Sequence, residues 1–379
     1  MKRKIRKAAE LTAFYLYNRI SGKFRRLDDR KVVFASEARD SLKGNLKAVY
    51  DKMPEDFEKV IHLKGDRRDG ESAGETLRLW RDLTTAKYIL LDDFYGLIST
   101  MKVRKGQEIV QLWHGAGAFK KFGFSRVGTG DNITNVHTGY RKYTKAAVTA
   151  EPIRGCFAEA FDIDIEKVQA VGNPRTDVFF DEEAKKAAAD RVYKAYPQLK
   201  DKKVVLIAPT YRGRKVEDAD YVFDKLQADK IAEELGNEYT VAVKWHPALY
   251  NNIKRGICEF NADGVTDTSS YSDINDLLVI ADVLVTDYSS VIFDWYLMDK
   301  PVVYFTYDLA DYESGRGLYY EFREYVYGTV AENCRDLITA IKDAELCADL
   351  RDAFGEKFMS ACDGKSTERV IAWITGREY

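Results

Sequence analysis

Two histidines in this sequence each close a short apolar run of the kind that forms a β-strand. His114 stands in QLWHGAGAFKK at 111–121, and His246 stands in KWHP at 244–247. A histidine exchanges a proton near neutral pH, so such a residue can act as a general base or stabilise charge on a phosphate. One histidine at a strand end is more often structural than catalytic. One in each half of the chain, however, predicts a catalytic pair.

The residues that follow His114 add a second expectation. Gly115 and Gly117 allow the backbone to approach a ligand closely. We expect a helix to begin after them, with an N-terminus that can hold an anion.

Two further segments carry residue types that bind phosphate. In PTYRGR at 209–214, Arg212 lies on a glycine-containing loop beside Thr210, and a guanidinium can bind phosphate oxygens through paired hydrogen bonds. In the second segment, an apolar run leads into a polar turn that should start a helix, where hydroxyls and backbone N–H groups can seat a phosphate. A solvated loop and an ordinary helix cap are the alternative interpretations. The residues of the turn are Thr286, Asp287, Ser289 and Ser290.

Other patterns narrow the chemistry. Asp92-Asp93 follows a predicted strand, but no further carboxylate or histidine accompanies the pair, so we interpret it as a solvated turn. We therefore predict no metal site, and a requirement for a divalent metal stays open. The sequence contains no GxxxxGKS/T, no GxGxxG after the first strand, no HExxH and no GxSxG. These absences disfavour a P-loop kinase, a simple dehydrogenase, a zincin and an enzyme with a serine nucleophile elbow.

Composition and charge exclude further classes. A chain of 379 residues exceeds what one hydrophobic core usually serves, so two domains are expected. The net charge of −2 argues against a nucleic-acid partner. The five cysteines are scattered without a CxxC pair, which favours a reducing compartment. Because no apolar run approaches the roughly 20 residues of a membrane span and no signal peptide is visible, we expect the catalytic body in the cytoplasm.

The first 26 residues are strongly basic, unlike the chain as a whole, with nine Lys or Arg residues and Glu10 as the only acid. Apolar residues recur there near every fourth position, among them Leu16, Ile20 and Phe24. Such a basic amphipathic helix can lie in a bilayer interface with anionic headgroups. It can equally pack on its own domain with a solvated basic face, and both interpretations stay open.

Short apolar runs alternate with helical stretches along the rest of the chain, as in sheets of buried parallel strands. A charged, alanine-rich helix near 181–196 separates two series of runs. We predict a basic helix at 1–30, an acceptor-side α/β domain at 31–181, a linker helix at 182–199 and a second α/β domain at 200–379, with a C-terminal helix that returns towards the first domain. The predicted strands are 32–35, 59–63, 88–91, 108–112, 146–149 and 168–170, then 204–208, 240–244, 264–267, 283–286 and 302–304.

Taken together, the motifs resemble those of the CDP-glycerol glycerophosphotransferase family of teichoic acid and capsule synthesis. The QxWHG element, PTYR, WHP and TDYSS occur in family order, together with VGNPRTD at 171–177, KPVVYFTYDL at 300–309 and GRG at 315–317. The resemblance runs from about residue 32 to the C-terminus. One departure is Ala116-Gly117, where family members often have Thr-Pro, and it affects the expected acceptor contacts.

The resemblance implies a GT-B-type fold, in which two Rossmann-like domains with parallel sheets face each other across a cleft. In the family, an acceptor hydroxyl attacks the alditol-bearing phosphate of a CDP-alditol, and CMP leaves. By motif, His114 is implied to be the base that deprotonates the acceptor. The implied donor clamp consists of His246, Arg212, Thr210, Thr286, Ser289 and Ser290, with Asp287 ordering the turn, and Gly115, Lys120 and Arg175 are implied to lie on the acceptor side or to support it.

The expected activity is transfer of glycerol phosphate from CDP-glycerol to an undecaprenyl-linked teichoic acid or capsule precursor, at the cytoplasmic face of the membrane. The short chain favours a primase-like single addition. Two alternatives stay open, namely a CDP-ribitol donor and a nucleotide-sugar glycosyltransferase on the same fold. Release of CMP rather than a nucleoside diphosphate distinguishes the last of these.

Overall fold

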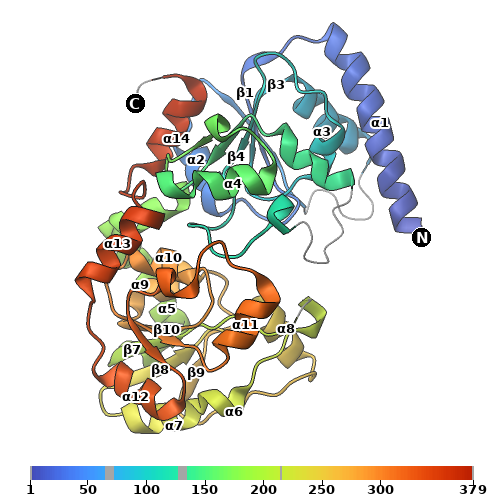
Figure 1. Ribbon diagram of the computed structural model, residues 1–379. Helices are drawn as coiled ribbons and strands as arrows, with labels where there is room; N and C mark the ends of the chain where they lie inside the picture. Colours follow the sequence, from blue (N-terminus) through green and yellow to red (C-terminus); the bar gives the residue numbers. More distant parts are fainter. Residues whose placement is uncertain (1, 65–71, 127–134, 214–215, 378–379) are drawn as a thin grey trace. The chain divides into compact units, whose positions relative to one another are not determined.

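The computed structural model describes residues 2–64, 72–126, 135–213 and 216–377 (Figure 1). The chain divides into two compact units. The first unit comprises Met1–Asp177 and Lys357–Tyr379, and the second comprises Val178–Glu356. Each unit is an α/β structure built on one parallel sheet.

The sheet of the first unit has six strands in the order β2-β1-β3-β4-β5-β6. All neighbouring strands are parallel, with β1 paired to both β2 and β3. The strand order reverses between β1 and β3, and open α/β sheets bind ligands at the carboxyl ends of strands next to such a switch point. The strands are β1 Asp28–Ala35, β2 Glu58–His62, β3 Ala86–Leu91, β4 Glu108–Gln111, β5 Lys145–Ala147 and β6 Val168–Gln169, and the helices are α1 Lys2–Phe24, α2 Gly44–Lys52, α3 Ala73–Thr85, α4 Arg154–Phe161 and α14 Ser366–Thr375.

The sheet of the second unit also has six parallel strands, in the order β12-β11-β10-β7-β8-β9. Numbered within the unit, this is the Rossmann order, which reverses between β7 and β10. The strands are β7 Lys203–Ile207, β8 Tyr239–Val243, β9 Val265–Asp267, β10 Val283–Thr286, β11 Val302–Phe305 and β12 Thr329–Ala331. The helices are α5 Glu182–Ala195, α6 Phe223–Leu226, α7 Ala228–Leu235, α8 Pro247–Lys254, α9 Ile274–Ile280, α10 Val291–Tyr296, α11 Leu309–Arg316, α12 Cys334–Lys342 and α13 Ala348–Phe358.

The C-terminal helix α14 departs from the predicted boundary of 200–379 because it belongs to the first unit. Its buried residues Val370, Ile371 and Ile374 share a core cluster with Val32 and Leu46 of the first sheet and its cover. The backbone N–H groups at the start of α14 donate to the carboxylate of Asp177. The predicted return of a C-terminal helix towards the first domain therefore describes the chain better than the boundary does.

The helix predicted as a linker at 182–199 lies within the second unit as α5. Arg191 of α5 forms two hydrogen bonds to the carboxylate of Asp276 in α9, with lengths of 2.9 and 2.7 Å. Since α5 packs on α9 through this pair, it forms part of the domain cover rather than a free connection.

Each predicted strand overlaps an observed one, and β12 was missed because it is short and two of its three residues are exposed. The helix expected to begin after Gly115 and Gly117 does not begin there. Bends occupy residues 114–117, and the next helical turn described is the 3-10 helix Gly123–Arg126. The local anion site expected at that helix start is therefore absent from 114–122.

Candidate active site

His114 follows β4 at the carboxyl edge of the first sheet, on a backbone that the preceding residues hold in an unusual conformation. Trp113 has a φ of 56°, which a bulky residue rarely adopts. The buried side chain of Gln111 accepts a hydrogen bond from the Trp113 N–H (2.8 Å) and donates one to the Asp93 carbonyl (3.0 Å). Gln111 thus joins the ends of β3 and β4 and fixes the turn that presents His114.

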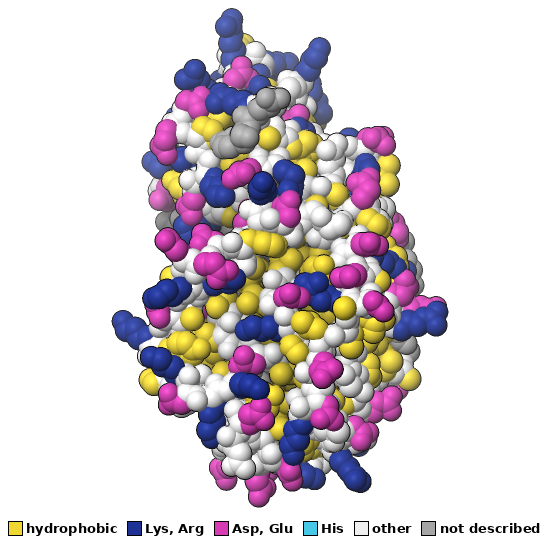
Figure 2. All heavy atoms as spheres, turned by 90° about the vertical axis from the view of Figure 1, so that its left-hand side faces the viewer, with side chains coloured by type: hydrophobic (Ala, Val, Ile, Leu, Met, Phe, Trp, Pro, Cys, Tyr) yellow, Lys and Arg dark blue, Asp and Glu magenta, His cyan; other side chains and the backbone are white. Residues whose placement is uncertain are grey.

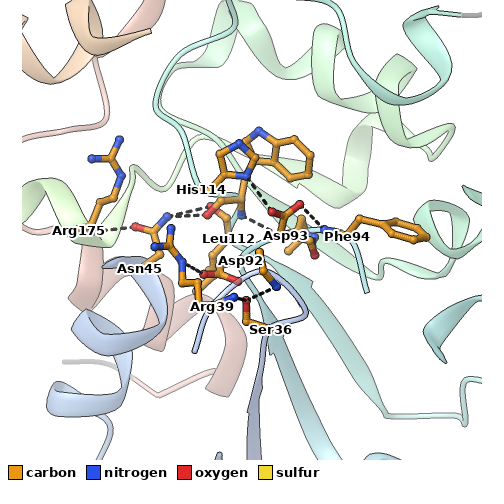
Figure 3. Close-up of polar contacts among 12 residues, drawn as sticks. Ser36, Arg39, Asn45, Asp92, Asp93, Phe94, Leu112, His114 and Arg175 are labelled. Carbon is orange, nitrogen blue, oxygen red and sulfur yellow. Dashed lines mark hydrogen bonds and ion pairs between the residues drawn. The ribbon is translucent and has the colours of Figure 1, made fainter. Parts of the chain in front are cut away.

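The imidazole ring of His114 is held between an aromatic ring and a carboxylate (Figure 3). It stacks on Trp113, with ring centroids 4.6 Å apart, and Trp113 stacks in turn on Phe122. The Nδ1 atom lies 3.7 Å from Oδ2 of Asp93, whose Oδ1 accepts the N–H of Phe94 (2.7 Å). Because 46% of the His114 side chain remains exposed, a ligand can reach the ring.

The surroundings of His114 lower its pKa below the ordinary value of 6.5. Desolvation is the largest cause, the carboxylate of Asp93 opposes it, and the charges of Arg39 and Arg175 add to the lowering. The ring is therefore neutral at pH 7 and able to accept a proton.

This pKa shift predicts a pH dependence. A base that must be neutral gives activity that falls with acid, so kcat/KM for the acceptor should fall with a midpoint below 6.5. Replacing Asp93 by asparagine removes the charge that raises the pKa, so the midpoint should move to still lower pH. Initial rates across the acid range measure both midpoints, and an upward shift in the Asp93→Asn variant would contradict this assignment.

Asn45 connects the His114 turn to Arg175. Its buried amide donates to the carbonyls of Trp113 (2.8 Å) and Leu112 (3.2 Å) and accepts the N–H of Arg175 (2.8 Å). Arg175, predicted on the acceptor side, therefore lies near the histidine in the first unit (Figure 3).

Gly115 and Lys120, also predicted on the acceptor side, lie in the segment that follows His114. The carbonyl of Gly115 accepts a hydrogen bond from Asn173 (3.4 Å), and Lys120 is partly buried farther along.

The interpretation of Asp92-Asp93 as a solvated turn was wrong. Asp92 is 1% exposed and forms an ion pair with Nε of Arg39. Asp93 is the carboxylate beside His114. The pair directly follows β3, next to the switch point, and this position at a strand end was a signal in the sequence that pointed to a functional site.

In the second unit, Arg212 joins the loops that follow three neighbouring strands. Its guanidinium contacts both carboxylate oxygens of Asp308, through Nε and through Nη2 (2.8 Å for the latter), and Nη1 donates to Asp287 (2.8 Å). Asp287 is fully buried and also accepts the N–H of Thr210 (2.7 Å). Arg212 is thus engaged by protein carboxylates, which is not the arrangement expected of a primary phosphate ligand.

Tyrosine rings surround the same guanidinium. Four ring centroids lie 5.1–5.4 Å from its central carbon, within range of cation–π attraction. The hydroxyl of Tyr288 also donates to Asp308 (3.0 Å), and burial together with that carboxylate raises the pKa of Tyr288. Neither Asp308 nor this cage was predicted from the sequence, although Asp308 lies within the KPVVYFTYDL motif at 300–309. The four rings are Tyr221, Tyr288, Tyr307 and Tyr312.

His246 is exposed and caps the first turn of α8. Its Nδ1 accepts the N–H of Ala248 (3.2 Å), so in the neutral ring the proton resides on Nε2. The ring packs against Tyr211, with centroids 4.7 Å apart. His246 therefore presents an N–H donor at the carboxyl edge of the second sheet.

The polar turn after β10 divides into buried and accessible residues. Thr286 is buried and donates to the carbonyl of Ala208 (2.8 Å), which joins β10 to the end of β7. Ser289 is partly buried and its Oγ accepts the N–H of Val291 (3.4 Å), whereas Ser290 is exposed at the start of α10. The predicted donor residues thus lie after β7, β8 and β10 at the carboxyl edge of the second sheet, with Thr286 in a supporting position.

In the described part of the chain, no group of three or more His, Cys, Asp or Glu side chains is placed to hold a metal ion. None of the described helices is both long and apolar enough to cross a bilayer.

On the molecular face shown in Figure 2, Lys and Arg side chains are interspersed with Asp and Glu side chains.

Comparison with known proteins decides the family. The model of the CDP-Glycerol:Poly(glycerophosphate) glycerophosphotransferase family matches residues 16–376. The chain belongs to this family. The resemblance inferred from the sequence motifs is thereby confirmed.

Several relatives of this chain are named for teichoic acid synthesis. It is 41% identical to the teichoic acid poly(ribitol-phosphate) polymerase of Bacillus spizizenii, over 92% of this chain and 56% of that protein. It is 35% identical to the teichoic acid ribitol-phosphate primase of the same organism, over 91% of this chain and 90% of that protein. It is 30% identical to the teichoic acid glycerol-phosphate primase of Bacillus subtilis, over 76% of this chain and 73% of that protein. The chain thus spans just over half the length of the first of these relatives.

A solved structure has the same fold as this chain. The wall teichoic acid polymerase TagF superposes with a TM-score of 0.77 at 22% identity, over 98% of this chain and 93% of that one. The predicted GT-B-type class, with two Rossmann-like units on parallel sheets, is confirmed at the level of fold.

Proposed function

We propose that this chain transfers an alditol phosphate from a CDP-alditol to a hydroxyl of a lipid-linked wall-polymer precursor, with release of CMP. The observation that carries the proposal is His114, an accessible histidine with a lowered pKa and a carboxylate partner at the edge of the first sheet. Family membership supports the class of reaction.

The first unit supplies the base. Because Nδ1 of His114 faces Asp93, the proton of the neutral ring favours Nδ1, and Nε2 is left as the acceptor. Nε2 takes the proton of the acceptor hydroxyl, whose oxygen forms a bond to the alditol-bearing phosphorus. The bond from this phosphorus to the CMP oxygen breaks, and CMP leaves. Asp93 stabilises the imidazolium that forms.

The second unit supplies the donor site. The Nε2–H of His246 and the hydroxyls of Ser289 and Ser290 donate hydrogen bonds to phosphate oxygens of the CDP-alditol, where they offset charge in the transition state.

Arg212 acts as a positioning residue, because its bonds to Asp287 and Asp308 hold three loops in place. Thr210 and Thr286 support the same backbone.

The comparisons favour ribitol over the glycerol predicted from the sequence. Four relatives named for ribitol phosphate are 34–41% identical to this chain, whereas four named for glycerol phosphate are 28–31% identical. CDP-glycerol remains the second candidate, because the family carries its name and a TagF variant has been solved with CDPG.

The test is CMP release from CDP-ribitol and CDP-glycerol in parallel, with a lipid-linked acceptor present or absent. The expected result is acceptor-dependent CMP with the higher kcat/KM for CDP-ribitol. Product length in the same assay distinguishes single from repeated addition. Failure to release CMP from either donor would overturn the proposal.

His246→Asn is the matched variant on the donor side. Asparagine is a good helix cap and can still accept the Ala248 N–H, but it lacks the Nε2–H donor. We expect unchanged thermal stability and a loss of roughly 10²-fold in kcat, as for removal of one preorganised donor to a transition-state oxyanion. A variant as active as the wild type would contradict the role of His246.

The membrane is the proposed location of the acceptor, and α1 is the proposed contact. One face of α1 packs on its own unit, where Phe14 is fully buried against Trp80. On another face, Leu16, Ile20 and Phe24 are 52%, 60% and 83% exposed. These apolar side chains, next to basic residues, suit an anionic bilayer surface at the cytoplasmic face.

Replacing Leu16, Ile20 and Phe24 together by serine should abolish flotation with anionic liposomes, because the exposed apolar face is lost. Turnover of a short water-soluble acceptor should persist, since the buried face of α1 is intact. Equal flotation of the variant and the wild type would rule out this contact.

A further inference from the structure

Two arginines converge beside His114 in the first unit. A Cβ placed on Gly44 would lie 3.7 Å from Nη2 of Arg39 and 3.9 Å from Cδ of Arg175, so both side chains border the same glycine. Both charges also act on the His114 ring. The cluster lies at the carboxyl ends of β1 and β3, where the strand order reverses and α/β sheets bind ligands.

The positions of both arginines are fixed by other residues. The hydroxyl of Ser36 accepts the N–H of Arg39 (3.2 Å), and Asp92 binds its Nε. Asn45 accepts the N–H of Arg175 while donating to the carbonyl of Trp113, next to His114 (Figure 3). The backbones of both arginines are therefore anchored beside the His114 turn, and Asp92 also holds the guanidinium of Arg39.

Asp92 adds a second observation. Its Oδ1 is buried and has no hydrogen-bond partner among the residues that the structure describes. Buried carboxylate oxygens are nearly always satisfied, so the cluster is one donor short. A ligand that combines an anionic group with hydroxyls would supply both missing interactions.

We propose that Arg39 and Arg175 form an anion subsite for the phosphate of the acceptor's terminal alditol phosphate, with Asp92 accepting a hydrogen bond from one of its hydroxyls. The inference rests on the proposed function. Once a first unit has been added, the next attacking hydroxyl belongs to an alditol whose other end is esterified to phosphate. A pair of arginines suits such a phosphodiester, because each guanidinium donates two parallel hydrogen bonds. The subsite selects acceptors that already carry phosphate and directs their free hydroxyl to His114.

The direct test is calorimetric titration of the full chain with ribitol phosphate and with ribitol, without any donor. Ribitol phosphate should bind roughly 10- to 100-fold more tightly, the range expected for hydrogen bonds to a charged group. Arg175→Gln should remove this preference. Arg39→Gln combined with Asp92→Asn should do the same without leaving a buried carboxylate unpaired.

Arg141→Gln is the matched control, because Arg141 is an exposed arginine of the same unit that pairs with Asp162. It should bind ribitol phosphate as the wild type does. Inorganic phosphate should compete with ribitol phosphate, since both occupy the anion position. Equal binding of ribitol and ribitol phosphate, or full affinity in Arg175→Gln, would overturn the subsite. The titration needs neither donor nor turnover, so a failed transfer assay overturns the proposed reaction and not this site.

Discussion

Replacing His114 by alanine is expected to lower acceptor-dependent CMP release by about 10²- to 10⁴-fold, the contribution of a positioned general base. The variant loses the atom that takes the acceptor's proton, whereas the donor loops of the second unit keep their contacts. Single-turnover CMP release measures the chemical step, and titration with the CDP-alditol measures donor binding. We expect the rate to fall and the donor affinity to stay unchanged.

Asp93→Asn is the graded control for this result. It preserves shape but removes the charge that faces Nδ1 and stabilises the imidazolium, so its rate should lie between those of His114→Ala and the wild type. His114→Ala with nearly normal turnover would exclude the histidine as base. Loss of donor affinity in the same variant would place His114 on the donor side instead.

Replacing Arg212 by methionine is expected to lower the free energy of unfolding of the second unit by roughly 3–5 kcal/mol, as for other buried ion pairs that lose one partner. Asp287 is fully buried, and the Arg212 side chain is only 17% exposed, so solvent cannot replace the lost cation. Calorimetry should show an earlier unfolding transition, and donor affinity should fall because three loops lose their common anchor.

A combined variant separates charge from packing. Adding Asp287→Asn and Asp308→Asn to Arg212→Met removes the unpaired carboxylates, so part of the lost stability should return. Donor affinity should stay low, since the loops remain unanchored. An Arg212→Met single variant with the wild-type unfolding temperature would show that the ion-pair cluster contributes little.

Much of the fold follows from local sequence, because buried parallel strands are short apolar runs that end in polar turns. The runs around Val33 and Val285 are of this kind, and both coincide with central strands. The assignment of α14 to the first unit could not be read in the same way. The apolar face of a short helix predicts burial, but it does not say which of two sheets the helix covers.

In the candidate site, too, local sequence predicts some features, whereas others depend on contacts between distant parts of the chain. His114 and His246 were predicted because a polar residue at a strand end lies at the binding edge of such a sheet. The partners that define their surroundings depend on contacts across the sequence. Arg212 and Asp308 are 96 positions apart, and no local pattern pairs them. The φ of Trp113 likewise depends on Gln111 and on the neighbouring strand.

Phosphorus NMR of the chain with CDP-ribitol and a lipid-linked acceptor tests the proposed phosphotransfer most directly. We expect the diphosphate signals to disappear while CMP and one new phosphodiester appear in equal amounts, and only when the acceptor is present. Release of CDP with transfer of an unphosphorylated group would contradict phosphotransfer and identify a glycosyltransferase-type reaction on the same fold.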